Sequence, residues 1–154
     1  MQRIMFVCHG NICRSPMAEF VLRDLAMKAG RANEFRIASS ATSAEEVGNP
    51  VHPGTRRILA AHGIDCVGKE ARQLRRDEYR SWDLFVAMDD ENLRRLSRIL
   101  GKDPEHKVHK LLEFATPEAF GAAVRDVADP WYTGDFEATW DDVLAGCTGL
   151  LAAL

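Results

Sequence analysis

The chain has 154 residues, of which 46% are hydrophobic and 28% are charged, a composition typical of an ordinary globular protein. This length predicts one domain over residues 1–154 with a single core. A net charge of −3 and a pI near 5.9 argue against nucleic acid or an anionic membrane as a partner. The local basic stretch is interpreted as the solvated face of a helix; it contains Arg72, Arg75, Arg76 and Arg80.

Cysteine content and hydropathy indicate the compartment. The N-terminal apolar run is too short for a secretion signal, and no stretch approaches the length of a membrane span. We therefore expect a cytoplasmic protein whose four cysteines are reduced. Two of them, Cys66 and Cys147, are expected to pack in the core.

Predicted strands and helices alternate along the chain. In chain order they are a strand at residues 3–8, a helix at 16–29, a strand at 35–38 that leads into Ser39 and Ser40, a helix from Pro53 to Gly63, a strand at 83–88, a helix capped by Asp89 and stopped by Gly101, a weaker strand at 108–112, and a final helix. The final helix carries an apolar stripe that indicates core packing, made of Phe136, Trp140, Val143, Leu144, Cys147 and Leu151.

This alternation predicts an α/β fold in which a parallel sheet is covered by helices on both faces. Ligands of such open sheets bind beyond the carboxyl ends of the strands. Cys8, Ser39 and Asp89 fall at such ends. We therefore expect a functional site where these three residues meet.

The segment between the first strand and the first helix reads Cys8-His9-Gly10-Asn11-Ile12-Cys13-Arg14-Ser15. Backbone N–H groups of a tight loop at a helix N-terminus converge on an anion. Gly10 and Asn11 tolerate the positive φ that such a loop demands. Arg14 offers a planar fork for two phosphate oxygens, and the same positive surroundings favour the thiolate of Cys8. Ser15 is expected to donate a hydrogen bond to that sulfur and to cap the helix.

The simplest alternative is that Cys8 is a buried structural cysteine at a strand end, since free cysteine is among the most buried residue types. Three features favour the interpretation of Cys8 as a nucleophile in an anion-binding loop. They are the strand before it, Gly10 and Asn11 inside the loop, and the Ser15-Pro16 helix start. A nucleotide P-loop is excluded, because no lysine and hydroxyl residue follow the glycine.

If the Cys8 thiolate attacks a bound phosphate ester, it forms a phosphocysteine, and the leaving group then needs a proton donor. The best candidate is Asp129, which is followed by Pro130, Trp131 and Tyr132. The two aromatic residues can form a wall against a flat substrate ring. The alternative is an ordinary Asp-Pro turn with aromatic side chains in the core.

Together these motifs resemble the low-molecular-weight protein tyrosine phosphatase family. Similar segments run from Val7 to Glu19 and recur at residues 40–43, 48–50, 62–64, 71–73, 88–93 and 129–132. The resemblance implies a three-layer flavodoxin-like fold with a four-stranded parallel sheet. It also implies hydrolysis of protein phosphotyrosine and small aryl phosphates to inorganic phosphate through a phosphocysteine, without a metal or other cofactor.

The resemblance also implies roles for individual residues. Cys8 matches the nucleophile, Arg14 the phosphate clamp and Asp129 the general acid and base. The matched residues of the hydrogen-bond network that shapes the loop and stabilises the thiolate are Asn11, Ser15 and Ser39. Cys13 matches a second loop cysteine that can trap Cys8 as a disulfide under oxidation. The aromatic side of the cleft is matched by Trp131 and Tyr132.

The chain departs from the family pattern at two positions. Lys69 stands where many members carry a histidine bonded to the loop asparagine. Glu45 stands where some members carry an aromatic residue, so one wall of the cleft is expected to be acidic. With His9, another variable cleft position, Glu45 predicts a substrate preference particular to this chain. We expect a monomer or a weak dimer.

Two other enzymes on this fold stay open as alternatives. An arsenate reductase normally needs two further cysteines for its disulfide relay, and the two that remain, Cys66 and Cys147, lie far apart in the sequence. A protein arginine phosphatase tends to carry threonine where this chain has Ile12.

Two further alternatives are not enzymes: a phosphate-binding module and a zinc site. A non-hydrolytic phosphate-binding module would share Cys8 but would have no need for Arg14 together with the distant Asp129. A zinc site is disfavoured, because His106 and His109 flank a predicted strand far along the chain from the loop cysteines.

Overall fold

The computed structural model describes residues 1–115 and 124–154, and its centre is a parallel sheet of four strands in the order β2-β1-β3-β4. The strands are β1 (Gln2–Cys8), β2 (Phe35–Ala41), β3 (Leu84–Ala87) and β4 (Val108–Lys110). β1 pairs with β2 along its whole length, from Gln2 opposite Phe35 to Cys8 opposite Ala41. Cys8 therefore ends a central strand, at the edge where ligands of parallel sheets bind.

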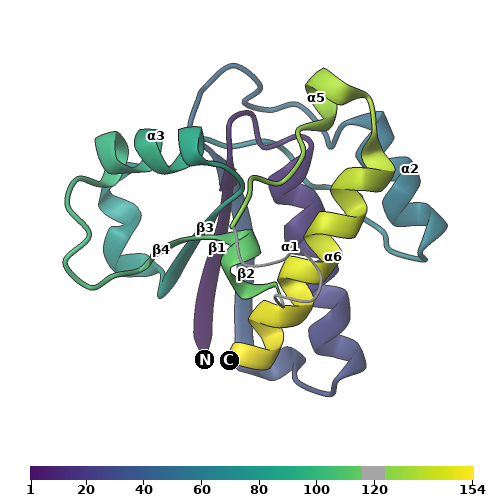
Figure 1. The fold of residues 1–154 in the computed structure, drawn as a ribbon, viewed down its shortest axis with the longest axis horizontal. Coiled ribbons are helices and arrows are strands. Elements are labelled where there is room, and N and C mark those ends of the chain that lie inside the picture. Colours follow the sequence, from purple (N-terminus) through teal and green to yellow (C-terminus); the bar gives the residue numbers. More distant parts are fainter. Residues whose placement is uncertain (116–123) are drawn as a thin grey trace.

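Helices cover both faces of the sheet. They are α1 (Arg14–Lys28), α2 (Pro53–Ala61), α3 (Asp90–Leu100), the short α5 (Pro130–Thr133) and α6 (Phe136–Ala153), with 3₁₀ turns at Ala32–Glu34, Arg76–Ser81 and Leu111–Phe114. α1, α2 and α6 lie on one side, and α3 lies on the other with the turn Arg76–Ser81 (Figure 1). These three layers confirm the predicted α/β, flavodoxin-like architecture.

The alternation of side chains along β1 divides the core in two. Ile4, Phe6 and Cys8 join the cluster beneath α1 and α6. Met5 and Val7 point the other way, into the cluster beneath α3. Because both faces of the strand are buried, its sequence is a continuous apolar run rather than an alternating one.

The predicted core positions of the last helix are confirmed. Trp140, Val143 and Cys147 of α6 are buried against the sheet side of the molecule. Cys66 belongs to the same cluster, as expected. No helix in the described parts of the chain is long and apolar enough to cross a membrane.

Two strand ends differ from the prediction by more than one residue. β2 continues to Ala41, so Ser39 and Ser40 lie inside the strand rather than after it. β4 ends at Lys110 instead of continuing through residue 112. The Lys110 N–H donates to the Glu113 carboxylate at 3.0 Å, which turns the chain into the 3₁₀ turn Leu111–Phe114.

Arg75, Arg76 and Arg80 of the arginine-rich stretch are exposed, as predicted, but they lie in and beside a 3₁₀ turn rather than on one helix face, and Arg72 is paired. Arg72 lies before the turn Arg76–Ser81, and its guanidinium holds both oxygens of the buried Glu78, at 2.8 and 3.1 Å. Arg76 and Arg80 are exposed on the turn. Glu78 is buried in the folded protein, and Arg72 pairs with it because a buried ionised carboxylate requires a partner.

Candidate active site

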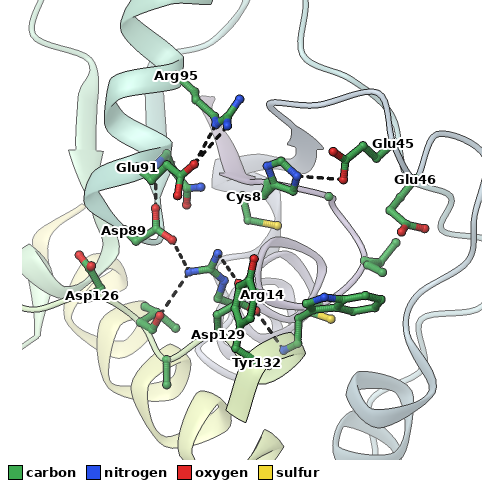
Figure 2. A pocket seen from close by; sticks show the side chains of 18 residues that line it. Cys8, Arg14, Glu45, Glu46, Asp89, Glu91, Arg95, Asp126, Asp129 and Tyr132 are labelled. Carbon is green, nitrogen blue, oxygen red and sulfur yellow. Dashed lines mark hydrogen bonds and ion pairs between the residues drawn. The ribbon is translucent and has the colours of Figure 1, made fainter. Parts of the chain in front are cut away.

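A cavity of about 580 Å³ opens at the carboxyl ends of β1 and β3. Figure 2 shows its walls: Cys8 and the loop that follows it, the Glu45–Glu46 segment after β2, the start of α3 with Asp89 and Glu91, and the segment that carries Asp126, Asp129 and Tyr132. Segments distant in the sequence therefore meet where the alternation of strands and helices predicted a site.

Cys8 lies at the base of this cavity with its sulfur held by hydrogen bonds. Its side chain is buried, Ser15 Oγ lies 2.9 Å from Sγ, and the Asn11 N–H donates to Sγ at 3.3 Å. Donors aimed at a sulfur stabilise its thiolate over its thiol. These two contacts hold the Cys8 sulfur in place at the start of the loop.

The predicted cap by Ser15 is wrong. α1 begins at Arg14, with Cys13 in the N-cap position, and no side chain caps it. Ser15 is inside the first turn, where its hydroxyl points at the Cys8 sulfur instead of at a backbone N–H. The open N-terminus of α1 is left to a ligand in the loop.

The predicted backbone of the loop is correct at one of its two positions. Asn11 has a φ of 62°, in the left-handed region that asparagine tolerates. Gly10 does not have a positive φ. A Cβ at Gly10 would lie 3.3 Å from Glu46 Cγ, so glycine at this position makes room for a neighbouring side chain.

The Asn11 side chain is fixed at all its polar positions. Its Nδ2 donates to Ser15 Oγ at 2.8 Å and to Ser39 Oγ at 2.9 Å, and its Oδ1 accepts from the Arg72 N–H at 3.2 Å. Ser15 Oγ therefore already accepts one hydrogen. Its own hydrogen is free to point at the Cys8 sulfur.

Lys69, which replaces the expected histidine, supports this network by another route. Its Nζ donates to the Ser39 carbonyl at 2.8 Å and lies 3.4 Å from the buried Glu19. Glu19 in turn accepts from Ser39 Oγ at 2.6 Å and pairs with Arg23 at 2.7 Å. Burial lowers the pKa of Lys69 although the Glu19 charge opposes that effect.

Arg14 is buried and its guanidinium faces the cavity between two carboxylates. Nη1 donates to Asp89 at 2.7 Å and to the Val127 carbonyl at 3.2 Å, and Nη2 donates to Asp129 at 3.2 Å. Burial alone would lower the pKa of Arg14, but the negative charges of Cys8, Asp129 and Asp89 raise it. The guanidinium therefore stays charged.

Asp89 is the site residue whose role the sequence did not indicate beyond its place at a strand end. One carboxylate oxygen caps α3 by accepting from the Asn92 N–H at 2.7 Å, and the other accepts from Arg14. The cap was predicted and is confirmed. The contact with Arg14 joins residues 75 positions apart, which no local pattern encodes.

Asp129 is the N-cap of the short helix α5. One oxygen accepts from the Trp131 N–H at 3.1 Å and the other from Arg14. The carboxylate is only partly buried and lines the cavity. The start of the short helix α5 fixes the backbone of Asp129, and its carboxyl group lines the cavity that also contains Cys8.

The walls of the cavity mix aromatic and acidic side chains. Trp131 and Tyr132 line the cavity and are mostly exposed, and the ring centroids of Trp131 and His52 lie 6.1 Å apart with their planes nearly perpendicular. Glu45 lines another part of the wall (Figure 2), and His9 Nε2 lies 3.1 Å from its carboxylate. Ile12 and Cys13 also line the cavity, whereas Asn11, Ser15 and Ser39 form the buried layer behind it.

Comparison with known proteins assigns the chain to a family. Residues 3–154 match the family described as "Low molecular weight phosphotyrosine protein phosphatase". The chain belongs to the low-molecular-weight protein tyrosine phosphatases.

Relatives within this family match along nearly their whole length. "Low molecular weight protein-tyrosine-phosphatase YfkJ" of Bacillus subtilis is 38% identical over 154 residues, which is 100% of this chain and 96% of the relative. PtpA of Staphylococcus aureus strain Newman, of the same description, is 36% identical over 151 residues, covering 98% of this chain and 92% of the relative.

Solved structures give the same assignment. The crystal structure of Bacillus subtilis YfkJ superposes with a TM-score of 0.92 over 99% of this chain and 94% of that one, at 38% identity. A low-molecular-weight protein tyrosine phosphatase from Streptococcus pyogenes gives a TM-score of 0.86 at 35% identity, over 100% of this chain and 93% of that one.

Within residues 1–115 and 124–154, no three or more His, Cys, Asp or Glu side chains gather as a metal site. His109 instead bonds to Glu113 and to the His106 carbonyl, at 3.2 and 3.1 Å.

Proposed function

We propose that this phosphatase hydrolyses phosphotyrosine in proteins through a phosphocysteine, with Cys8 as nucleophile, Arg14 as phosphate clamp and Asp129 as general acid and base. The observation that carries the proposal is the meeting of these three side chains in one cavity, where Arg14 contacts Asp129 at 3.2 Å and the Cys8 sulfur is flanked by two donors. Family membership supports the same reaction type.

In the first half-reaction, the phosphate occupies the loop at the open N-terminus of α1. Arg14 and the loop N–H groups stabilise the charge of the equatorial oxygens. The Cys8 thiolate attacks phosphorus in line, forming the S–P bond as the bond to the tyrosine oxygen breaks. Asp129 gives its proton to the departing phenolate.

In the second half-reaction, Asp129 is a carboxylate and accepts a proton from water. The water oxygen attacks phosphorus, the S–P bond breaks, and inorganic phosphate and the Cys8 thiolate are released. Asp129 is then protonated again, ready for the next substrate. The partial exposure of Asp129 supports this cycle, because water reaches its carboxyl group.

The walls of the cavity favour a flat aromatic leaving group. Trp131 and Tyr132 offer ring faces beside the catalytic space, and Ile12 adds apolar surface to the loop. The acidic wall at Glu45 and Glu46 is open to solvent, so it acts on residues of the substrate protein rather than on the phosphate. We accordingly favour phosphotyrosine over phosphoarginine.

The decisive assay is phosphate release from a phosphotyrosine peptide in the presence of a chelator and a reductant. The wild type should turn over many times, and Cys8→Ser should lose nearly all turnover while still binding phosphate. Asp129→Ala should slow turnover by about 10²-fold or more, since general acid–base catalysis contributes about 10²–10⁴-fold. Equal release by the wild type and Cys8→Ser would overturn the assignment of Cys8.

The same preparation tests the alternatives. Faster release from a phosphoarginine peptide would make this chain an arginine phosphatase. Arsenate reduction with a thioredoxin or glutaredoxin would make it a reductase, although Cys66 and Cys147 are both buried in the core. Persistent phosphorylation of Cys8 without release would indicate a non-hydrolytic phosphate-binding module.

We also propose that Cys8 and Cys13 form a reversible disulfide. Both line the cavity. Hydrogen peroxide oxidises the Cys8 thiolate to a sulfenic acid, and the Cys13 sulfur displaces hydroxide from it, so that water leaves and an S–S bond forms. Peroxide followed by a reductant should restore activity in the wild type and much less in Cys13→Ser.

The remaining parts of the proposal concern the whole protein. We propose one phosphatase domain over residues 1–154, working as a monomer or weak dimer in the reducing cytoplasm. The four unpaired cysteines, Cys8, Cys13, Cys66 and Cys147, support that compartment. Sedimentation at several protein concentrations tests the oligomeric state, and cell fractionation tests the location.

A further inference from the structure

Lys110 holds a buried position that the catalytic scheme does not explain. It ends β4, and only 8% of its side chain is exposed. Its Nζ lies 2.8 Å from Asp126 and 3.0 Å from Asp90, both of them largely exposed carboxylates. A buried ammonium is costly unless it is paired, so the two carboxylates keep Lys110 charged in this place.

The partners of Lys110 belong to two different segments. Asp90 is the first residue of α3. Asp126 lies three residues before Asp129, beside the cavity (Figure 2). Asp126 also accepts from the Asp90 N–H at 3.2 Å. The ammonium of Lys110 therefore ties the segment that carries Asp129 to the end of β4 and the start of α3.

The two residues between Asp126 and Asp129 are held as well. The Val127 N–H donates to the Met88 carbonyl at 2.9 Å, which places Val127 at the end of β3. The Ala128 N–H donates to Asp142 of α6 at 3.1 Å. Each of these bonds fixes one residue through the backbone, whereas Lys110 joins this segment to the end of β4 through an ion pair.

We propose that Lys110 is a positioning residue for the general acid: by binding Asp126 it holds Asp129 above Cys8. The inference rests on the proposed function of Asp129. Burial tends to lower the pKa of Lys110, but Asp126 and Asp90 raise it, so the ammonium persists through the neutral range. Misplacement of a general acid by about 1 Å is enough to weaken catalysis strongly.

Dependence on the leaving group is the readout that separates positioning from a merely structural role. A good leaving group such as p-nitrophenolate departs with little help from an acid, whereas phenolate from phenyl phosphate needs a proton. We expect Lys110→Met to lower kcat/KM for phenyl phosphate by about tenfold, a part of the full acid contribution, and for p-nitrophenyl phosphate by less than about threefold.

Asp126→Asn should reproduce this pattern, because it removes the ion pair at its exposed end and leaves the buried lysine in place. Its matched control is Asp90→Asn. This substitution removes the other carboxylate partner of Lys110 and leaves the sequence of the segment that carries Asp126 and Asp129 unchanged. Lys107→Met is a second control: Lys107 is a half-buried lysine just before β4 that donates to the Tyr79 carbonyl at 2.9 Å and pairs with Glu105. Both controls should keep the wild-type ratio of the two substrates.

The background variant Asp129→Ala completes the test. With the acid gone, Lys110→Met and Asp126→Asn should cause no further loss on phenyl phosphate. Equal losses on both substrates, or a full additional loss in the Asp129→Ala background, would overturn the positioning role. Failure of the proposed function itself looks different, since the wild type would then release no phosphate or Asp129→Ala would match the wild type on phenyl phosphate.

Discussion

The Ser15 hydroxyl lies 2.9 Å from the Cys8 sulfur and accepts a hydrogen bond from Asn11 at the same time. The second hydrogen of the Asn11 amide goes to Ser39, and the Ser39 hydroxyl donates to the buried Glu19. Donors and acceptors are thus ordered from Glu19 to Cys8, so the Ser15 hydrogen is directed to sulfur. If Cys8 is the nucleophile, as we propose, this order makes Ser15 a hydrogen-bond donor to it.

Removal of that hydroxyl should slow the attack of Cys8. A hydrogen bond to a charged group contributes about 1.5–3 kcal/mol, so we expect Ser15→Ala to lower kcat/KM for p-nitrophenyl phosphate by about tenfold or more. The control is Ser40→Ala, since Ser40 is equally buried on β2 but contacts Met5 instead. Equal activities of the two variants would contradict the role of Ser15.

Asp89→Asn should impair Arg14 without unfolding α3. The asparagine oxygen still caps the helix, because asparagine is a good N-cap residue. The charged contact with Arg14 is lost, so we expect weaker competitive inhibition by inorganic phosphate and a loss of kcat/KM of about tenfold. An unchanged thermal midpoint, measured beside these kinetics, would show that the fold is intact; unchanged inhibition by phosphate would contradict the prediction.

Alkylation should distinguish the two loop cysteines. Burial, together with the nearby charges of Cys8 and Asp129, raises the pKa of Cys13 to about 12, so its thiol is neutral at pH 7. Iodoacetamide should therefore label Cys8, which phosphate protects, and leave Cys13 unmodified. Peptide mass mapping at pH 7 measures both sites, with Cys8→Ser as the control that should take up almost no label. Labelling of Cys13 at the same rate as Cys8 would contradict the prediction that the Cys13 thiol is unreactive at pH 7.

The Arg72–Glu78 pair should make stability depend on acid. Burial tends to raise the pKa of Glu78, but hydrogen bonds from Arg72 and the Arg75 N–H lower it overall. A carboxyl group with a lowered pKa in the folded state stabilises the protein above its unfolded pKa, about 4.3, and loses this contribution as the pH falls through its folded pKa.

We therefore expect Glu78→Gln to lower the thermal midpoint at pH 7 by roughly 5 °C, the effect of about 2 kcal/mol in a domain of this size. The difference from the wild type should shrink as the pH falls below about 4. Glu34→Gln, which breaks the exposed pair with Arg31, should change the midpoint much less. A difference that grows in acid would have the wrong sign.

Much of the fold could be predicted because it is encoded locally. The apolar run of β1, the Pro53 start of α2 and the Asp89 cap of α3 each depend on residues within a turn or two of one another. The end of β4 was predicted wrongly although its cause is also local: the Glu113 carboxylate, three residues further on, accepts a hydrogen bond from the Lys110 N–H.

The sequence alone was enough to predict the cysteine loop. Cys8, Asn11, Ser15 and Arg14 lie within eight consecutive positions between a strand and a helix, so their proximity follows from chain connectivity. It also indicated Asp129 through its proline and aromatic neighbours. It did not indicate how Asn11 is held when Lys69 replaces a histidine.

The contacts between segments distant in the sequence depend on the folded arrangement. Arg14 meets Asp89 across 75 residues and Asp129 across 115, and Lys110 meets Asp126 at the far edge of the sheet. These pairs depend on the order β2-β1-β3-β4, which sets the strand ends that share one edge. Hydrophobic periodicity records which face of an element is buried, but it carries no information about which element lies opposite that face.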